Sequence, residues 1–287
     1  MDTKRIRKLR KKIITTVPKF PNDKITKTNL ESKHLTDLLL VYLNWAARLI
    51  TPRPRKMLIE NEVMQDSRWD TYSENFRYLK KEIERGEDLT PYLSLKVQEK
   101  GYTPAASSTD PNTDKWTDKD FLLNVMGFYH LHLGEKKERA KVSERTDNVI
   151  FAKVDRDTFH IVGLFNHSVF EKTDDITNEM SKERERLWNI FDKHTVQGVP
   201  ENSIILQSLI SLSAHNAEIV RLAQEYVRII EDVEPQLDNR VYADSLYEQS
   251  NISSPEKSKF EWYLRGTDLG VFDEATNLFM VLRYGVN

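Results

Sequence analysis

Three short segments near the middle of the chain alternate apolar and polar residues, and the chain on either side of them has helical periodicity. The alternation covers residues 128–133, 148–154 and 158–165, and a period of two residues is typical of strands. Residues 155–157, Asp-Arg-Asp, separate the last two segments and predict a tight turn. These three strands predict a small antiparallel sheet in the centre of the sequence.

Helices are expected before and after this sheet. Apolar residues recur with helical spacing in residues 35–50, 70–84 and 202–233, and the charged segment 174–193 also predicts a helix. Gly86 is placed to end the second of these. The C-terminal residues alternate again and predict a second hairpin. We therefore expect an α+β protein, a small antiparallel sheet surrounded by helices, with a C-terminal β-hairpin.

Changes in composition divide the chain into six expected parts. Small, polar and proline residues after position 103 predict a long loop, which is the main internal boundary. The parts are a basic N-terminal arm (1–24), a helical segment (25–102), a linker (103–119), an antiparallel β core (120–173), a second helical segment (174–234) and a C-terminal hairpin region (235–287).

Composition excludes several classes of protein. With no cysteine among 287 residues and only 9 Gly and 10 Pro, the chain is neither a disulfide scaffold nor a thiolate zinc finger, nor a Gly/Pro-rich disordered protein. It has no apolar run of the roughly 20 residues that cross a membrane and no apolar secretory signal. We expect a cytoplasmic protein without a membrane span.

Positive charge is concentrated in the first 12 residues, where seven Lys and Arg residues stand against one Asp. Such a cluster attracts polyanions by displacing counterions, so nucleic acid is an expected partner. A solvated tail is the first alternative. A short basic amphipathic helix, docked on the protein itself or on a membrane, is the second. The cations are Lys4, Arg5, Arg7, Lys8, Arg10, Lys11 and Lys12.

Histidines gather in the predicted sheet. Four of the seven lie there or at its end, at His130, His132, His160 and His167. Because residues two apart on a strand share a face, His130 and His132 should project side by side. The cations expected near them are Arg145 and Lys153. Catalytic groups often stand on loops and strand ends of a rigid sheet.

Such a group could support two chemistries. Imidazoles acting as base and acid, with Arg or Lys holding the phosphoryl group, would cleave RNA through the adjacent 2′-hydroxyl without a metal or cofactor. Alternatively, the His130 and His132 pair could join His160, His167 or a carboxylate and bind a metal that activates water. Histidines hydrogen-bonded to the backbone would have a structural role only.

A strand ending at Gly134, Arg145 before an apolar strand, a tight turn and a last strand closing at His167 form one further pattern. In this arrangement residues 128–170 resemble the core of RelE/ParE-like toxins. The resemblance implies that Arg145 binds phosphate and that His167 is an acid or base. The family often has an arginine and a tyrosine after that histidine. Their replacement here by Ser168 and Phe170 would weaken its leaving-group chemistry.

The sequence therefore predicts a metal-independent ribonuclease or ribosome-associated toxin-like protein, of the kind used in phage defence. His130, His132 and His167 would exchange protons, and Arg145 with Lys153 would stabilise the charge of the transition state. One alternative is a non-catalytic interaction module that self-associates through the helix of residues 202–233. The other is a metal-dependent hydrolase that uses the His-x-His pair.

Overall fold

The chain folds into two units, in which the second interrupts the first. The terminal unit comprises residues 1–47, 99–104 and 217–287, and the central unit comprises residues 48–98 and 105–216. The computed structural model describes residues 2–94, 97, 99–104, 123, 125–135, 142–171, 177, 179–196, 216–248 and 250–287. Within these ranges, none of the helices combines the length and the apolar character needed to cross a membrane.

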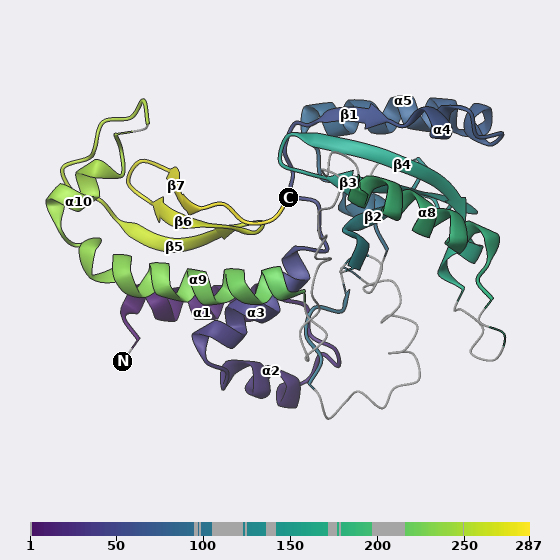
Figure 1. Cartoon of the computed structure of the whole chain (residues 1–287). Coiled ribbons are helices and arrows are strands. Elements are labelled where there is room, and N and C mark those ends of the chain that lie inside the picture. Colours follow the sequence, from purple (N-terminus) through teal and green to yellow (C-terminus); the bar gives the residue numbers. More distant parts are fainter. Residues whose placement is uncertain are drawn as a thin grey trace. The chain divides into compact units, whose positions relative to one another are not determined.

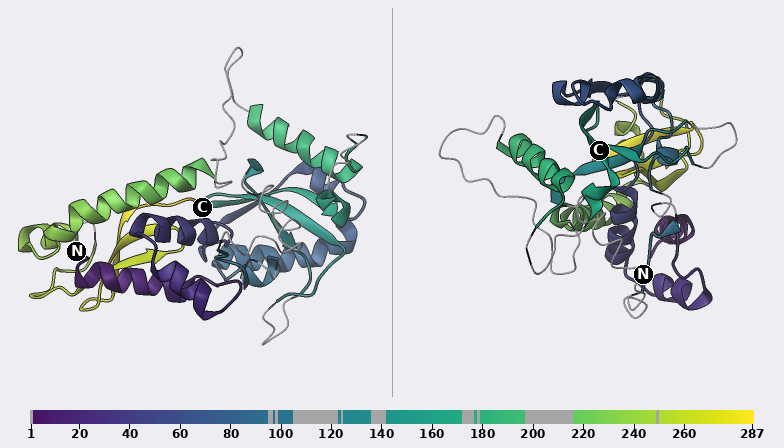
Figure 2. Two further views of the ribbon diagram at one scale, coloured as in Figure 1. Left: turned by 90° about the horizontal axis from the view of Figure 1, so that it is seen from below. Right: turned by 90° about the vertical axis from the view of Figure 1, so that its right-hand side faces the viewer.

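The terminal unit packs helices on a three-stranded sheet (Figure 1). Its helices are α1 (Lys4–Thr16), α2 (Lys24–Glu31), α3 (Leu35–Ala46), α9 (Ala217–Val233) and α10 (Arg240–Ser245), with a short 3-10 turn, η4 (Glu234–Gln236). Its strands are β5 (Phe260–Arg265), β6 (Asp268–Asp273) and β7 (Leu278–Arg283), antiparallel and in that order. Helices α1, α3 and α9 run along the same side of this sheet (Figure 1, Figure 2).

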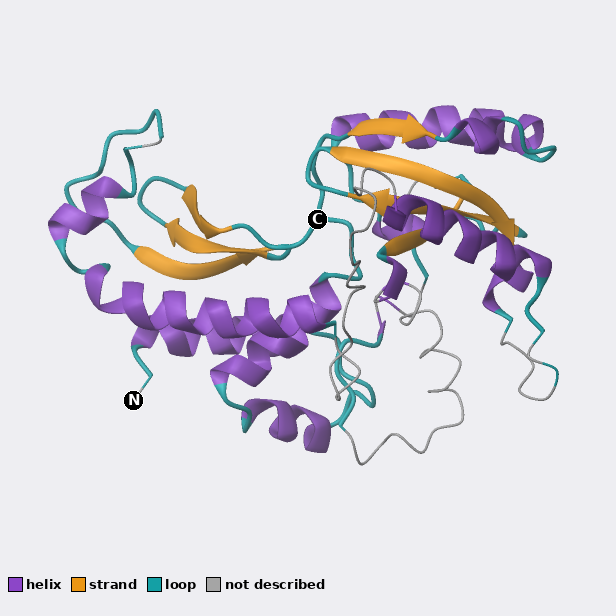
Figure 3. Ribbon diagram, viewed as in Figure 1, coloured by secondary structure: helices purple, strands orange, loops and turns teal. Residues whose placement is uncertain are grey.

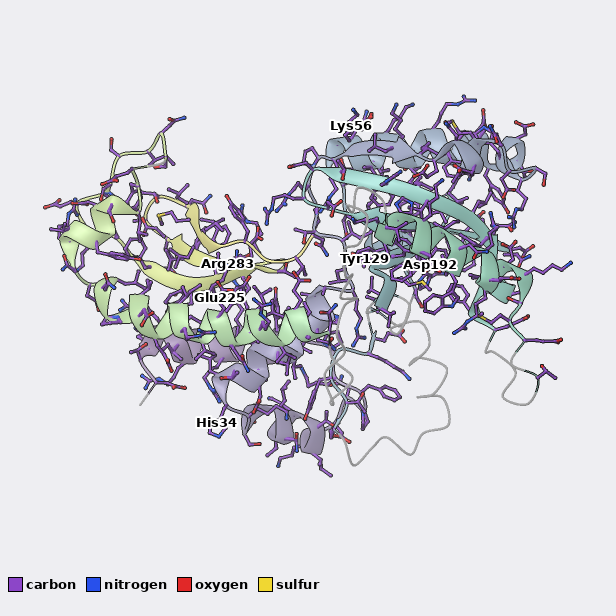
Figure 4. The ribbon with its side chains drawn as sticks, in the orientation of Figure 1. His34, Lys56, Tyr129, Asp192, Glu225 and Arg283 are labelled. Atoms are coloured by element: carbon purple, nitrogen blue, oxygen red, sulfur yellow. The ribbon has the colours of Figure 1, made fainter. Side chains whose placement is uncertain are left out.

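One apolar core joins these helices to the sheet. Leu43 of α3 and Tyr226 of α9 are fully buried together with Val271 of β6. This burial follows from the helical spacing of apolar residues, which gives each helix one apolar face. At the surface, an ion pair of 2.8 Å between Arg283 and Glu225 connects β7 to α9 (Figure 4).

The basic N-terminal segment is a docked helix, α1, and the expectation of a solvated tail is wrong. Thr3 caps the helix by accepting a hydrogen bond from the Ile6 amide at 3.2 Å. Leu9 and Ile13, one turn apart, are each 1% exposed in the core. The interpretation as an amphipathic helix on the protein's own body is confirmed.

The central unit has a four-stranded sheet between helices (Figure 3). Its strands are β1 (Lys56–Ile59), β2 (Phe128–His132), β3 (Asn148–Val154) and β4 (Thr158–Asn166), in the order β1-β4-β3-β2. Its helices are α4 (Asn61–Met64), α5 (Trp69–Arg85) and α8 (Lys182–Val196), with two 3-10 turns, η1 (Thr90–Tyr92) and η3 (His167–Phe170).

Each face of this sheet has its own core, because successive strand residues point to opposite sides. Ile150 and Phe159 pack with Phe76 of α5. Phe151 packs with Leu187 of α8 on the other face. The predicted histidine face is the one covered by α8.

The sheet is mixed, because an unexpected strand from outside the antiparallel β core of residues 120–173 joins it in parallel. Strand β1 pairs with β4 in parallel, while β2, β3 and β4 are antiparallel. Strand β1 lies within the segment 25–102 that we expected to be helical. Its four residues are too few to establish an alternating pattern, and they follow a proline-rich stretch that interrupts helix.

Several other expectations are confirmed. Strands β2, β3 and β4 lie where alternation predicted them, and β6 with β7 forms the C-terminal hairpin, to which β5 adds a third strand. Gly86 ends α5 with φ of 74°, and a Cβ there would lie 2.4 Å from the Pro54 nitrogen. The predicted linker beyond residue 104 and the first part of the predicted 202–233 helix lie outside the described residues.

Candidate functional site

Three of the predicted histidines and two phenylalanine rings are linked by a series of ring contacts. The ring centroid of His130 lies 5.0 Å from Phe170 and 5.9 Å from Phe151. His132 lies 5.6 Å from His167, and His167 lies 6.0 Å from Phe170. We call these five residues the aromatic group. The structure therefore brings His130, His132 and His167 together, as the sequence predicted.

Solvent exposure varies across the aromatic group, in which two residues are buried, His130 and Phe170 are half-buried and one is exposed. His132 is 9% exposed, Phe151 is fully buried, and His167 is the exposed histidine of the three. Nδ1 of His167 lies 2.8 Å from the Asp147 carbonyl oxygen. Since a carbonyl oxygen only accepts, this nitrogen is the donor and Nε2 is left as the acceptor of a neutral ring.

His160 belongs to a different site. Its Nε2 lies 3.1 Å from Oε1 of Glu60, and Nε2 of His194 lies 3.5 Å from the same oxygen. The two imidazole rings are 5.6 Å apart and nearly perpendicular, at 82°. Lys153 is opposite His160 in the antiparallel register. We call Glu60, Lys153, His160 and His194 the His160 cluster.

Four separate elements supply this cluster. Glu60 follows β1, and its amide donates to the Ile161 carbonyl oxygen at 3.1 Å, which continues the pairing with β4. Lys153 and His160 come from β3 and β4. His194 is in the last turn of α8. Because the parallel β1–β4 pairing sets Glu60 beside β4, the site depends on the strand that sequence patterns missed.

The His160 cluster is open to water on one side. The side chains of His160, Glu60 and His194 are 26%, 25% and 14% exposed, and Lys153 is exposed. Solvent can therefore reach both imidazoles, while Phe128 and Phe191 of the α8 core lie on the inner side.

Burial sets the protonation of His194. Desolvation lowers the pKa of this imidazole below its usual value, and the positive charges of Lys153 and Lys193 lower it further, while the Glu60 carboxylate opposes them. His194 is therefore a neutral base at physiological pH. In each neutral ring that donates its Nε2 proton to Glu60, Nδ1 carries the lone pair.

The two predicted cations are separated. Lys153 joins the His160 cluster, away from the histidines of the aromatic group. Arg145 lies in the loop before β3 and donates through Nη1 to the Leu93 carbonyl oxygen at 3.0 Å. Leu93 packs in the core covered by α5, on the opposite face of the sheet from the histidines. This contact directs the Arg145 guanidinium away from His167, where the predicted phosphate would bind.

Four of the seven N-terminal cations contact acidic or aromatic side chains inside the terminal unit. Arg5 pairs with Glu234 at 3.0 Å and with Asp238 at 2.8 Å. The other contacts are those of Lys8 with Glu261, of Arg10 with Asp2, and of the Lys12 ammonium with the Tyr263 ring at 3.5 Å. Lys4, Arg7 and Lys11 are exposed on α1.

Sequence reasoning missed Glu60 and His194. The expected helix 174–193 stops one residue before His194, and Glu60 follows an unpredicted strand. The signal that was present is a histidine in the last turn of a helix. His194 becomes part of a site because the parallel pairing of β1 with β4 places the Glu60 carboxylate beside it.

Metal binding finds no support in the described residues, which contain no group of three or more His, Asp or Glu side chains arranged as a metal site. In the His160 cluster both imidazoles direct Nε2 to one carboxylate oxygen.

A scan against protein-family models, a search of curated proteins and a search of solved structures find no match to this chain. The resemblance of residues 128–170 to RelE/ParE-like toxins stays a prediction.

Proposed function

We propose that this protein cleaves single-stranded RNA without a metal ion, and that the His160 cluster is its acid–base site. The observation that carries the proposal is the contact of two solvent-reachable imidazoles, 5.6 Å apart, with one carboxylate oxygen. Lys153 on the neighbouring strand supplies a cation. Two imidazoles and a lysine are sufficient groups for transfer of a phosphoryl group to an adjacent hydroxyl.

The reaction divides the work between the two imidazoles. Neutral His194 removes the proton from the 2′-hydroxyl, whose oxygen forms a bond to the adjacent phosphorus. Protonated His160 gives a proton to the 5′-oxygen as the bond from phosphorus to that oxygen breaks. Lys153 stabilises the negative charge on the non-bridging oxygens. The products are a 2′,3′-cyclic phosphate and a 5′-hydroxyl.

The surroundings of the cluster suit a phosphate chain. Lys56 and Leu58 of β1 share the face of His160, because Leu58 is in register with His160. Lys56 is exposed, and Leu58 is 36% exposed, which provides apolar surface for a base. Lys193, next to His194 in α8, pairs with Glu62 at 2.7 Å. Lys153 and Lys193 therefore lie close enough to His194 for their charges to lower its pKa, and Lys56 adds a positive charge two residues along β1 from Leu58.

The aromatic group is less suited to this work. His130 and His132 pack among phenylalanine rings, and Arg145 is directed to the other face. The proposal therefore moves acid–base catalysis from His130, His132 and His167 to His160 and His194. It keeps the predicted substrate class and chemistry.

Self-association through the long helix gains no support from the described part, α9. Its apolar face, including Ile219, Leu222 and Ile230, is buried in the core of the terminal unit. That face is therefore not available to a second copy.

The test uses the full-length protein and single-stranded RNA in excess chelator. We expect cleavage by the wild type, with 2′,3′-cyclic phosphate ends, and loss of at least about 100-fold in rate for His160→Ala and for His194→Ala. His34→Ala, a change at the start of α3 in the terminal unit, is the matched control and should leave the rate unchanged. Circular dichroism checks that each variant is folded.

Two results would overturn the proposal. One is the absence of cleavage by the folded wild type on RNAs of mixed sequence. The other is equal cleavage by the wild type and both histidine variants.

A further inference from the structure

Helix α1 has an unusual charge distribution for a helix that is part of a folded core. Its sequence, KRIRKLRKKIITT, contains no acidic residue. By contrast α5, the 17-residue helix of the central unit, mixes acids and bases along its exposed surface. The excess charge of α1 is therefore balanced by other elements or left facing solvent.

Neighbouring elements balance only the flanks of α1. On one flank Arg5 and Lys8 pair with Glu234 and Glu261. On the other flank Arg10 contacts Asp2 and donates to the Lys33 carbonyl oxygen at 2.7 Å.

Three exposed cations remain between these flanks. The side chains of Lys4 and Lys11 make no hydrogen bond or ion pair with any residue in the described ranges. The guanidinium of Arg7 donates only to a backbone oxygen, that of Asp2, at 3.1 Å. We call Lys4, Arg7 and Lys11 the α1 stripe.

The spacing of the α1 stripe follows from helix geometry. Residues three, four and seven apart lie within an arc of about 60° on one face. Along the axis, Arg7 is about 4.5 Å from Lys4 and about 6 Å from Lys11. The helix is held rigid by its buried face, with Leu9 and Ile13 in the core. Ordering these charges for a ligand therefore has little backbone entropy cost.

We infer that the α1 stripe is a docking surface for the phosphate backbone of single-stranded RNA, a contact separate from the His160 cluster. This inference rests on the proposed function for its choice of polyanion. Three phosphate contacts on a single strand contribute a slope of about −2 to the dependence of log K on log salt concentration. These three contacts therefore raise the affinity for the strand about 100-fold near 0.1 M salt.

The test measures binding of the full-length protein to a labelled single-stranded oligoribonucleotide over a range of salt concentrations. The triple variant Lys4→Gln, Arg7→Gln, Lys11→Gln should bind about 100-fold more weakly near 0.1 M salt, with a salt slope shallower by about 2. The matched control removes three exposed cations from α5, which carries acids beside them. These changes are Arg77→Gln, Lys80→Gln and Lys81→Gln, and they should alter affinity less than about threefold.

Cleavage of a dinucleotide separates this inference from the proposed function. A dinucleotide has only the one phosphate that is cleaved and none left for the α1 stripe, so the triple α1 variant should cleave it at the wild-type rate. His160→Ala should retain RNA binding and lose dinucleotide cleavage.

Equal RNA binding by the wild type and the triple α1 variant would overturn the inference, whatever the cleavage results. Binding that weakens only on phosphatidylserine vesicles, and not on RNA, would also overturn it and assign the stripe to an anionic membrane surface. Absence of dinucleotide cleavage by the wild type, with salt-dependent RNA binding through the stripe, would contradict only the proposed function.

Discussion

The aromatic group and the His160 cluster are two histidine sites on the same face of one sheet, yet their surroundings differ. In the aromatic group the rings of His130 and His132 contact phenylalanine or another imidazole. In the His160 cluster the imidazoles of His160 and His194 face a carboxylate oxygen at 3.1 and 3.5 Å. The imidazoles of the aromatic group are held mainly by ring packing, whereas those of the His160 cluster are held mainly by contacts with a charged carboxylate.

The difference shows that the number of histidines in a stretch of sequence does not reveal whether those histidines can transfer protons. An imidazole needs water or substrate on one side and an orienting partner on the other to transfer protons. The aromatic group has three histidines, of which His132 is buried, His130 is half-buried and His167 is exposed. The His160 cluster has both features with only two histidines, one of them outside the predicted sheet.

The largest expected difference between the two sites is in catalysis. His160→Ala and His194→Ala should each lower kcat for RNA cleavage by about 100- to 10,000-fold, the range of a lost acid or base. His132→Ala and His167→Ala should stay within about threefold of the wild type, because their rings do not touch the reacting groups. Single-turnover cleavage in excess chelator measures all four. Loss of activity confined to His132→Ala and His167→Ala would reverse our assignment of the sites.

Stability should show the opposite order. Phe151 is fully buried in the core under α8 and contacts Phe165, Phe170 and His130. Phe151→Ala should reduce the free energy of unfolding by about 3–5 kcal/mol. Leu58→Ala, at the exposed edge of the His160 cluster, should cost less than about 1 kcal/mol. Chemical denaturation followed by tryptophan fluorescence gives both values, and equal losses would contradict the contrast in packing.

Sequence patterns were sufficient for the elements that bury a regular face. The alternation in residues 148–154 and 158–165 located β3 and β4, and Gly86 located the end of α5. Burial enforces such periodicity, so it is visible in one chain. Strand β1 escaped because a four-residue strand at a sheet edge has no period to detect.

The candidate site was only partly predictable for the same reason. His160 and Lys153 were expected because both lie on strands with a clear period. Glu60 is 100 residues before His160 in the sequence, and the two meet only through the parallel pairing of β1 with β4. No local pattern specifies that pairing.

Glu60 should act as a positioning residue with a smaller effect than either imidazole. Glu60→Gln keeps the shape but removes the charge that orients His160 and raises the pKa of His194. We expect kcat to fall about 10- to 100-fold. The acid limb of the pH–rate profile should move to lower pH, because His194 then loses its proton more readily. A merely structural role would lower the rate without moving that limb.

The smallest expected effect is on stability as a function of pH. Because burial lowers the pKa of His194 in the folded state, the unfolded chain binds the proton more readily below about pH 6.5. The contribution of His194 to stability is therefore fully present above about pH 6.5 and is lost as the pH falls toward the lowered value. His194→Gln should reduce the loss of unfolding free energy between about pH 7.5 and pH 5. An unchanged loss would show that His194 titrates normally in the folded protein.

The most direct test of the His160 cluster uses uridine 3′-(4-nitrophenyl phosphate), whose leaving group departs without a proton. His160→Ala should cleave this compound at close to the wild-type rate in excess chelator, because the general acid is no longer needed. His194→Ala, without the base that removes the 2′-hydroxyl proton, should remain at least about 100-fold slower. Equal rates for both variants, whether wild-type or reduced, would contradict the division of proton transfer between His194 and His160.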